Sequence, residues 1–302
     1  MNTLILGGHG MLGSAIDFGL KPTRKELDIT DYESLSRYII KNDVTEIIHA
    51  AGTVGGVKAN TDFMYDFFMD NIRMNTNVIR ACKEHSINKA TFFLSTCVFP
   101  YQAPLPLVET SINDGEPHST NFGYAYAKRM LEVGSRCLLK QHGIETSCII
   151  PCNMYGKKDN YHLENGHVIP SLIHRCYLSK QNGTDFVVWG SGRAEREFMY
   201  ADDVAALLKQ IYVGQMNDIP PLMIVSPGYV HTIAEVVDVI VKHIGFTGKV
   251  VFDSTKSEGI LRKNTDNSLF RKHFPHFKFT DLNTGLEKSI EHFVKNYETV
   301  RK

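Results

Sequence analysis

Four side chains near the middle of the chain could cooperate in proton transfer. Ser95 and Cys97 come at the end of residues 89–95, an apolar run with the length of a buried strand. Tyr124 and Lys128 are four residues apart, so on a helix they lie on the same face. A hydroxyl, a thiol, a phenol and an ammonium group could therefore meet in one pocket. A tyrosine–lysine pair taken alone, however, is more often an ordinary pair on a helix surface.

These groups suit the reduction of a ketone. Tyr124 could donate a proton to the developing alkoxide if the pKa of its phenol, ordinarily about 10, is lowered. The ammonium group of Lys128 would lower that pKa because it stabilises the phenolate. Ser95 could donate a second hydrogen bond to the same oxygen. The sequence therefore predicts a reductase site in this part of the chain.

The N-terminal region has a glycine pattern that is typical of dinucleotide sites. Residues 3–6 have the composition of a short buried strand, and Gly7, Gly10 and Gly13 follow at three-residue spacing. Small residues there let backbone N–H groups approach a pyrophosphate near the positive end of a helix. Residues 14–20 are predicted to form a short first helix. An ordinary tight turn is the alternative interpretation of the glycines.

The segment after that helix bears on the choice between NAD and NADP. NAD sites usually carry an acidic residue about twenty positions on, whereas NADP sites place an arginine near the 2′-phosphate. Here Lys21, Arg24 and Lys25 precede the first acidic residues. We predict NADP (NADPH) as the cofactor, with Arg24 at the 2′-phosphate. The competing interpretation is a solvated charged loop.

Strand-like and helix-like segments alternate, which predicts an α/β fold with a parallel sheet covered on both faces. We predict a doubly wound, Rossmann-type NADP(H)-binding domain over residues 1–166, to which parts of 185–226 return. Residues 167–302 are predicted to form a smaller, interleaved α/β substrate-binding domain. Helices are expected at 31–40 (capped by Asp31), 61–85, 123–142, 167–178, 201–213 and 232–244, strands at 3–6, 45–52, 89–95, 144–151, 223–226 and 249–253, a strand, turn and strand at 185–198, and a polar loop at 254–265.

Composition argues against several other classes of protein. The chain has 302 residues, 43% of them hydrophobic, which suffices for one large or two interleaved domains. Its formal net charge of +0 argues against a nucleic-acid or membrane surface. No apolar run has the roughly 18 residues of a membrane span, and no basic region precedes the apolar N-terminal segment as in a signal peptide. The six cysteines lack paired metal spacing, so we expect no metal site and a reduced, cytoplasmic protein in which five of them fill core space.

Taken together, these motifs resemble the extended short-chain dehydrogenase/reductase family. G-G-H-G-M-L-G at 7–13 and Y-A-Y-A-K at 124–128 match its two defining motifs, although the first βαβ unit is shorter than in most members. The segments 94–100, 121–130, 159–170 and 187–198 are similar to those of the members that convert GDP-4-keto-6-deoxy-D-mannose to GDP-L-fucose. The resemblance implies 3,5-epimerisation of that substrate followed by NADPH-dependent reduction at C4.

The resemblance also implies roles for individual residues. Lys128 would hold the nicotinamide ribose, and Cys97 and His167 would be the base and the acid of the epimerisation. A thiol needs only a modest cationic environment to act as a base, and histidine titrates near neutrality. The catalytic set expected is Ser95, Cys97, Tyr124, Lys128 and His167, the cofactor contacts expected are Gly7, Gly10, Met11, Leu12, Gly13, Arg24, Ala50, Ala51, Tyr124, Lys128, Pro151 and Asn153, and the substrate contacts expected are Asn153, Arg175, Trp189, Arg196 and Lys263.

Simpler interpretations of these residues remain open at this stage. Cys97 could fill core space, His167 could cap a helix, and Trp189 could pack in the core. The basic residues of the substrate set could be surface charge. The protein could also act on another nucleotide-linked 4-keto sugar, or it could be a catalytically silent NADP-binding regulator.

Extended members of this family commonly form homodimers through a four-helix interface, so we predict a homodimer with no nucleic-acid or membrane partner. The helices expected in the interface are 61–85 and 123–142. The apolar residues predicted on their faces are Phe63, Phe67, Val78, Ile79, Met130, Val133 and Leu138.

Overall fold

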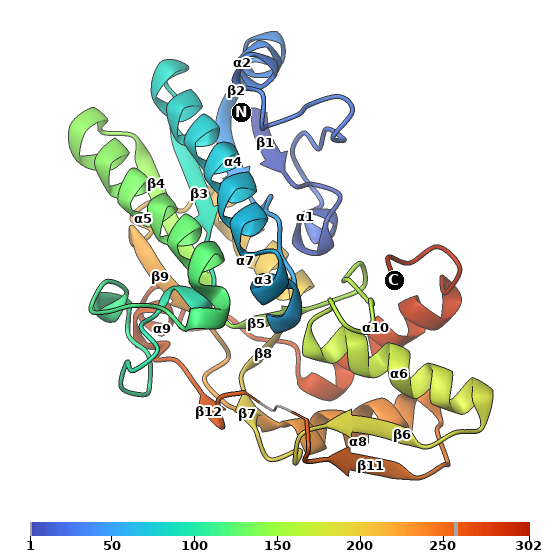
Figure 1. Ribbon diagram of the computed structural model, residues 1–302. Coiled ribbons are helices and arrows are strands. Elements are labelled where there is room, and N and C mark those ends of the chain that lie inside the picture. The colour runs from blue at the N-terminus through green and yellow to red at the C-terminus, as the bar shows by residue number, and fades with distance from the viewer. Residues whose placement is uncertain (1, 257–258) are drawn as a thin grey trace.

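A five-stranded parallel sheet forms the centre of the computed structural model, which describes residues 2–256 and 259–302 (Figure 1). The predicted loop 254–265 includes residues 257 and 258, which lie outside the described residues. The order of the strands is β1-β2-β3-β4-β9, and all four pairings are parallel. The strands are β1 (Asn2–Leu6), β2 (Val44–His49), β3 (Lys89–Phe93), β4 (Glu145–Pro151) and β9 (Leu222–Val225).

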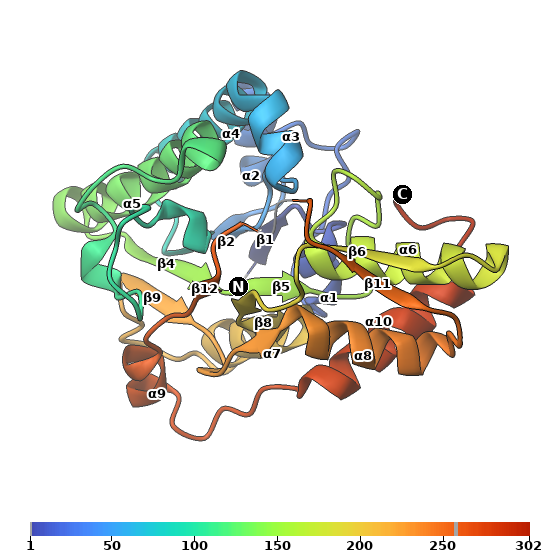
Figure 2. The same ribbon diagram turned by 60° about the horizontal axis from the view of Figure 1, so that its bottom comes forward.

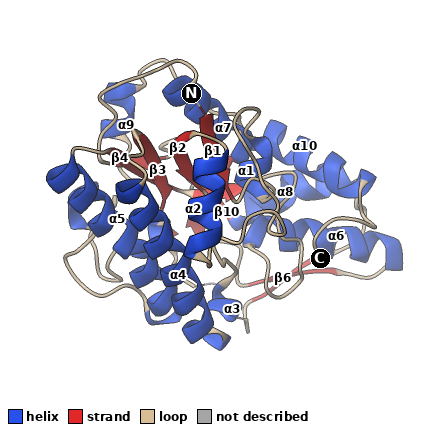
Figure 3. Ribbon diagram, turned by 90° about the horizontal axis from the view of Figure 1, so that it is seen from above, coloured by secondary structure: helices blue, strands red, loops and turns tan. Residues whose placement is uncertain are grey.

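Helices cover both faces of this sheet, namely α2 (Tyr32–Lys41), α4 (Met64–Glu84) and α5 (Phe122–His142) on one face and α1 (Met11–Ala15), α7 (Ala201–Tyr212) and α9 (Ser268–His273) on the other (Figure 3). Successive strand residues point to opposite faces. Leu4 and Ile47 accordingly lie in the core under α2, α4 and α5, whereas their neighbours Ile5 and Ile48 lie in the core under α1, α7 and α9. The predicted α/β fold with a doubly covered parallel sheet is confirmed.

The first βαβ unit is as short as the sequence suggests, but its helix lies elsewhere. The helix α1 ends at Ala15, so the prediction of a helix over 14–20 is wrong. The chain turns back because Gly19 has a φ of +76° and Leu20 pairs with the outer edge of β1 through two backbone hydrogen bonds of 2.8 Å. The bridge of Leu20 to β1 thus takes the place of a second strand on one side of β1. The strand β2, which follows later in the chain, pairs with the other side of β1. This divergence to the two sides of β1 is the place where open α/β sheets bind ligands.

The remaining elements build a second hydrophobic core beside the first sheet (Figure 2). Ile173, Val236 and Phe293 meet in this core. The elements are α6 (Val168–Asn182), α8 (Ile233–Ile244), α10 (Leu282–Lys295), the parallel pair β6 (Phe186–Trp189) and β11 (Val250–Asp253), the parallel pair β5 (Asn153–Tyr155) and β8 (Phe198–Tyr200), and the small sheet β10 (His231–Thr232), β7 (Glu195–Arg196) and β12 (Arg262–Lys263). That residues 1–166 and 167–302 form two domains stays a prediction.

Several predicted boundaries change for local reasons. The helix expected at 61–85 is divided, because Phe63 has non-helical backbone angles between α3 (Val57–Asp62) and α4. Asp31 caps α2 as predicted, since its carboxylate accepts the N–H of Glu33 at 3.0 Å. The strands β5, β8, β10 and β12 were not predicted, because strands of two or three residues carry no periodicity. None of the helices within the described ranges has the length and hydrophobicity that crossing a bilayer requires.

Candidate active site

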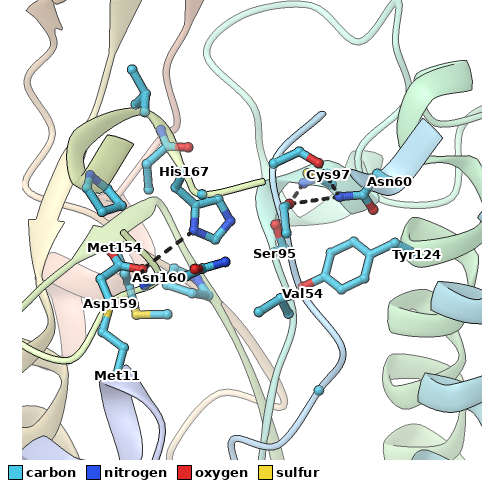
Figure 4. A pocket seen from close by; sticks show the side chains of 18 of the residues that line it. Met11, Val54, Asn60, Ser95, Cys97, Tyr124, Met154, Asp159, Asn160 and His167 are labelled. Carbon is cyan, nitrogen blue, oxygen red and sulfur yellow. Dashed lines mark hydrogen bonds and ion pairs between the residues drawn. The ribbon is translucent and has the colours of Figure 1, made fainter. Parts of the chain in front are cut away.

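A cavity of about 1720 Å³ lies at the carboxyl ends of the parallel strands. It exceeds the roughly 300–1,000 Å³ of a single small-molecule site, so two ligands can occupy it together. All the predicted catalytic, cofactor and substrate residues line it except Gly13. Figure 4 shows part of this cavity, with Ser95, Cys97 and Tyr124 on one side and His167 on the other.

The glycine turn after β1 requires glycine at two positions for different reasons. Gly7 has a φ of +80°, and a Cβ there would lie 2.7 Å from the backbone nitrogen of Ala51. Gly13 lies behind the turn, where a Cβ would lie 2.2 Å from the carbonyl oxygen of Gly7. Gly13 therefore lets α1 pack on the turn, whereas Gly7 and Gly10 line the cavity. The turn leaves backbone groups accessible where a pyrophosphate can approach.

Ser95 and Cys97 reach the cavity because β3 ends just before them. Ser95 caps the single 3₁₀ turn Thr96–Val98, and its Oγ accepts the backbone N–H of Cys97 at 3.3 Å. This bond uses Ser95 as an acceptor, so its hydroxyl proton remains able to donate to a ligand. Both side chains are half-buried, so neither simply fills the core.

Tyr124 and Lys128 project from the first turns of α5 into the same cavity, on one helix face as predicted. Tyr124 is 9% exposed, and its ring packs edge-on against Phe67 with centroids 6.5 Å apart. Lys128 is 4% exposed, and its Nζ donates to the carbonyl of Phe93 at 2.9 Å. The ammonium group lies 5.9 Å from the centroid of the Tyr124 ring.

Burial dominates the ionisation of this pair. It raises the pKa of Tyr124 above its ordinary value, and a negative charge on Cys97 would raise it further. Burial also lowers the pKa of Lys128 to about 8. The expectation that Lys128 lowers the pKa of Tyr124 is therefore wrong for this structure, in which the ammonium donates to Phe93. A phenol with a raised pKa is fully protonated at neutral pH, so Tyr124 remains able to act as a proton donor.

A buried amide holds α5 in register with the sheet. The Oδ1 of Asn75 on α4 lies 3.0 Å from Nε2 of His49, and its Nδ2 donates to the carbonyl of Ala127 at 2.8 Å. Burial, followed by the positive charge of Lys128, lowers the pKa of His49 to about 3, so this imidazole is neutral. The neutral imidazole and the amide fix the residue that precedes Lys128 without placing a second positive charge beside it.

His167 stands at the start of α6 but does not cap that helix through its side chain. Its Nδ1 instead lies 3.9 Å from Oδ1 of the buried Asp159, and 45% of its side chain is exposed. Burial alone would lower the pKa of His167, but the nearby carboxylate of Asp159 outweighs burial and raises it. A thiol and an imidazole thus face the same space from opposite sides (Figure 4).

Two cations lie next to each other at another part of the cavity wall. Arg196 on β7 and Lys263 on β12 are direct neighbours in the parallel pairing of these strands. Burial lowers the pKa of Lys263, a negative charge on Cys97 would raise it, and the charge of Arg196 lowers it. Two adjacent positive charges attract an anion, so this wall suits a phosphate-bearing ligand.

A cation and an aromatic ring form a further part of the wall. The guanidinium of Arg175 stacks on Trp189 at 4.0 Å from the ring centroid and donates to the carbonyl of Leu163 at 2.8 Å. Trp189 is 43% exposed, so the prediction that it reaches a ligand fits better than core packing. Asn153 also lines the cavity, and its Nδ2 donates to the carbonyl of Glu197 at 2.9 Å.

Comparison with known proteins agrees with this geometry. Residues 3–213 match the NAD dependent epimerase/dehydratase family. The chain is 37% identical to the GDP-L-fucose synthase of Dictyostelium discoideum, over 99% of this chain and 97% of that protein. The chain belongs to the NAD dependent epimerase/dehydratase family. The resemblance to the extended short-chain dehydrogenase/reductases that make GDP-L-fucose is thereby confirmed.

Two further proteins are similar to the chain over nearly its whole length. The GDP-L-colitose synthase of Yersinia pseudotuberculosis is 34% identical, over 97% of this chain and 98% of that protein. The crystal structure of a GDP-L-fucose synthetase from Naegleria fowleri bound to NADP is 33% identical and has a TM-score of 0.92, covering 99% of this chain and 94% of that one.

Sequence reasoning missed two groups at the site of this epimerase/dehydratase. Asp159 was not predicted, because nothing in its spacing to His167 marks the pair before the loop is folded. Arg301 lines the cavity although it stands one residue before the C-terminus, and the carbonyl of Arg301 accepts the N–H of Tyr161 at 2.8 Å.

The prediction that five cysteines fill core space is wrong for Cys137, which is exposed on α5.

Proposed function

We propose that this protein is an NADPH-dependent GDP-L-fucose synthase. It would epimerise C3 and C5 of GDP-4-keto-6-deoxy-D-mannose and then reduce C4 to give GDP-L-fucose. The observation that carries the proposal is the placement of Ser95, Cys97 and Tyr124 opposite His167 in one cavity (Figure 4). On this proposal the cavity provides both a reductase set and a second acid–base pair, and a reductase alone has no need of the second pair.

The cofactor side of the cavity fits NADP. The glycine turn accepts a pyrophosphate, and Ala50 and Ala51 after β2 leave space for the cofactor beside it. Arg24 would hold the 2′-phosphate, Lys128 the nicotinamide ribose, and Met11, Leu12, Pro151 and Asn153 would be the other contacts. When bound, NADPH supplies the hydride for reduction. The NADP-bound relative from Naegleria fowleri supports this choice.

Reduction needs a proton for the oxygen that becomes an alkoxide at C4. The protonated phenol of Tyr124 would donate that proton, and the Ser95 hydroxyl would hold the same oxygen through a second hydrogen bond. The Lys128 ammonium lies 5.9 Å from the centroid of the Tyr124 ring and donates to the carbonyl of Phe93, so Tyr124 rather than Lys128 would supply the proton. Together these groups would stabilise negative charge at one oxygen atom of the substrate.

Epimerisation needs a base on one face of the sugar ring and an acid on the other. Cys97 would remove the proton from C3 or C5, and His167 would return a proton to the same carbon from the opposite face. The enolate formed in between carries its charge on the C4 oxygen, which Tyr124 and Ser95 already face. One oxyanion site would therefore serve both halves of the reaction.

The substrate side of the cavity fits a sugar joined to a pyrophosphate. Arg196 and Lys263 would bind the negative charge, whereas Arg175 with Trp189, and Asn153, would contact the remaining part of the nucleotide sugar. The test is incubation with NADPH and GDP-4-keto-6-deoxy-D-mannose, followed by identification of the product sugar. The similarity to a GDP-L-colitose synthase makes another GDP-linked 4-keto sugar the main competitor, so a panel of such sugars is assayed in parallel.

Arg24 is expected to determine the preference for NADPH over NADH. It lines the cavity, whereas Nζ of Lys21 is hydrogen-bonded to the carbonyl of Ile16. Loss of a charge-assisted contact of about 1.5–3 kcal/mol weakens binding roughly 10- to 150-fold. Arg24→Ala should therefore weaken NADPH binding by this factor and leave NADH binding nearly unchanged, as measured by fluorescence titration.

The matched control is Lys25→Ala, which removes the same charge from the next residue, exposed and outside the cavity lining. It should leave the binding of both cofactors unchanged. Equal weakening of NADPH and NADH by Arg24→Ala would place the 2′-phosphate elsewhere, and His9, which also lines the cavity, would be replaced next.

We also propose a homodimer that pairs α4 and α5 of one copy with those of another. These helices lie side by side on the outside of the sheet (Figure 1) and expose Tyr65, Phe122 and Val133, the last at 50%. Of the apolar residues predicted for this interface, Phe67, Val78 and Leu138 are buried in the protein's own cores instead, because each helix has an inward apolar stripe as well.

Light scattering at micromolar concentration should give twice the mass of the chain. Val133→Glu should give the monomer mass, whereas Ile40→Glu, an equal change at an exposed residue of α2, should leave the dimer intact. A wild-type monomer would contradict the proposal.

A cytoplasmic location is proposed as well, supported by the six free cysteines, which suit a reducing compartment.

A further inference from the structure

A buried carboxylate lies behind the histidine of the site. The side chain of Asp159 is 5% exposed, and its Oδ1 accepts the backbone N–H of Asn160 at 2.7 Å. Its Oδ2 is buried and meets no hydrogen-bond donor within residues 2–256 and 259–302. A buried carboxylate is costly unless a cation or further donors compensate it, so this group needs a partner.

His167 pairs with this carboxylate. The two side chains approach to 3.9 Å between Oδ1 and Nδ1, and Figure 4 shows the imidazole between the carboxylate and the open space of the cavity. At this distance a small rotation of the ring brings Nδ1–H into hydrogen-bonding range. Such a bond leaves Nε2 directed at the cavity, where a substrate carbon would lie.

One positive charge opposes this pairing. Arg301 reaches the same region from the C-terminus, where its carbonyl accepts the N–H of Tyr161. Its charge lowers the pKa of His167, whereas Asp159 raises it, and Asp159 prevails over both burial and Arg301. The protonation state of His167 therefore depends on two charged groups from different parts of the chain. Asp159 lies on the 156–166 loop, and Arg301 lies near the C-terminus.

We propose that Asp159 is the positioning residue that orients His167 and keeps it an imidazolium for the epimerisation. This inference rests on the proposed function. In each inversion the Cys97 thiolate takes the proton of a C–H bond, which gives a thiol and an enolate. The His167 imidazolium then gives its Nε2 proton to that carbon from the opposite face, which restores the ketone and leaves a neutral imidazole. The thiol loses its proton to solvent and the imidazole regains one, so charge and protons balance.

The variant Asp159→Asn separates inversion from reduction. It keeps the side-chain shape but removes the charge, so the pKa of His167 falls. A fall of one pKa unit lowers the imidazolium fraction about tenfold at a pH above that pKa. Inversion at C3 and C5, measured by NMR of the product, should fall about tenfold or more. Oxidation of GDP-L-fucose by NADP⁺, which needs only the reductase residues, should stay within about twofold of the wild type.

Asp202→Asn is the matched control. Asp202 is a half-buried acid on α7, where it pairs with Lys157 at 3.2 Å. Its replacement removes the same charge beside Lys157, which stands two residues before Asp159 in the chain, and both activities should stay at the wild-type level. Inversion by Asp159→Asn at the wild-type rate would overturn the proposal, and so would an equal loss of inversion and of GDP-L-fucose oxidation.

The pH dependence of the inversion rate distinguishes a positioning role of Asp159 from a merely structural one, because a structural role would not shift it. Because Asp159 raises the pKa of His167, wild-type inversion should persist to a pH above the ordinary histidine pKa of about 6.5 and fall as the pH rises further. In Asp159→Asn this fall should move to lower pH, and in Arg301→Gln it should move to higher pH. Unmoved profiles in both variants would overturn the proposal.

NMR titration of ¹³C-labelled histidine tests the same point without any substrate. The His167 signal is assigned from its absence in His167→Asn, and its pKa should lie above about 6.5 in the wild type and lower in Asp159→Asn. A wild-type pKa at or below that value overturns the inference even if Asp159→Asn does not fold. Failure of the proposed function would be seen separately, as a wild-type protein that converts no GDP-linked keto sugar. The titration would still show in that case whether Asp159 raises the pKa of His167.

Discussion

Replacing Tyr124 by phenylalanine should lower the rate of C4 reduction by roughly 10²–10⁴-fold, the range typical for loss of a general acid. The phenol is the only group on α5 that faces the cavity with a proton to give, apart from the ammonium of Lys128, which donates to Phe93. Phenylalanine keeps the edge-on packing against Phe67, so the fold should be preserved. The rate is measured as NADPH consumption at saturating substrate.

Tyr126→Phe is the control for this variant. It makes the same chemical change two residues away on α5, where the ring packs against Phe122 with centroids 4.8 Å apart and lies outside the cavity lining. Its reduction rate should match that of the wild type. Reduction by Tyr124→Phe at the wild-type rate would show that another group supplies the proton.

Replacing Cys97 by serine should stop proton abstraction at C3 and C5 while the reductase residues stay intact. A hydroxyl is a far weaker acid than a thiol, whose ordinary pKa is about 8.5, so its conjugate base is scarcely populated. Incorporation of deuterium from D₂O at both carbons should fall by about 10²-fold or more. The variant should still reduce the unepimerised ketone slowly, which gives a D-rhamnose-type product.

The control is Cys137→Ser, the same change at an exposed thiol on α5. It should exchange deuterium and form product as the wild type does. If Cys97→Ser exchanges deuterium at the wild-type rate, Cys97 is not the base, and another group removes the protons from C3 and C5.

The parts of the fold that follow from periodic sequence were predictable. The continuous apolar runs of β1 to β4 and the helical patterns of α2 and α5 identify a parallel sheet between helices. The glycine turn and the Tyr124–Lys128 spacing locate the site on it. These signals are local, because each depends on residues within one turn or one strand of each other.

The parts that depend on folded packing were not predictable. The helix expected at 14–20 is absent because Leu20 pairs with β1, a contact that no local pattern announces. The pKa of Tyr124 is raised because its ring is buried against Phe67 and Ala59, which spacing to Lys128 does not reveal. Asp159 meets His167 only after the loop between β5 and α6 folds back, so an aspartate eight positions earlier carried no signal.

The position of deuterium in the product of the wild-type protein tests the central claim most directly. GDP-4-keto-6-deoxy-D-mannose is incubated with NADPH and the protein in D₂O, and the product sugar is analysed by NMR and mass spectrometry. The account predicts GDP-L-fucose with deuterium at both C3 and C5, since both carbons exchange through Cys97 and His167 before Tyr124 completes reduction. A D-rhamnose-type product with hydrogen at both carbons would contradict it.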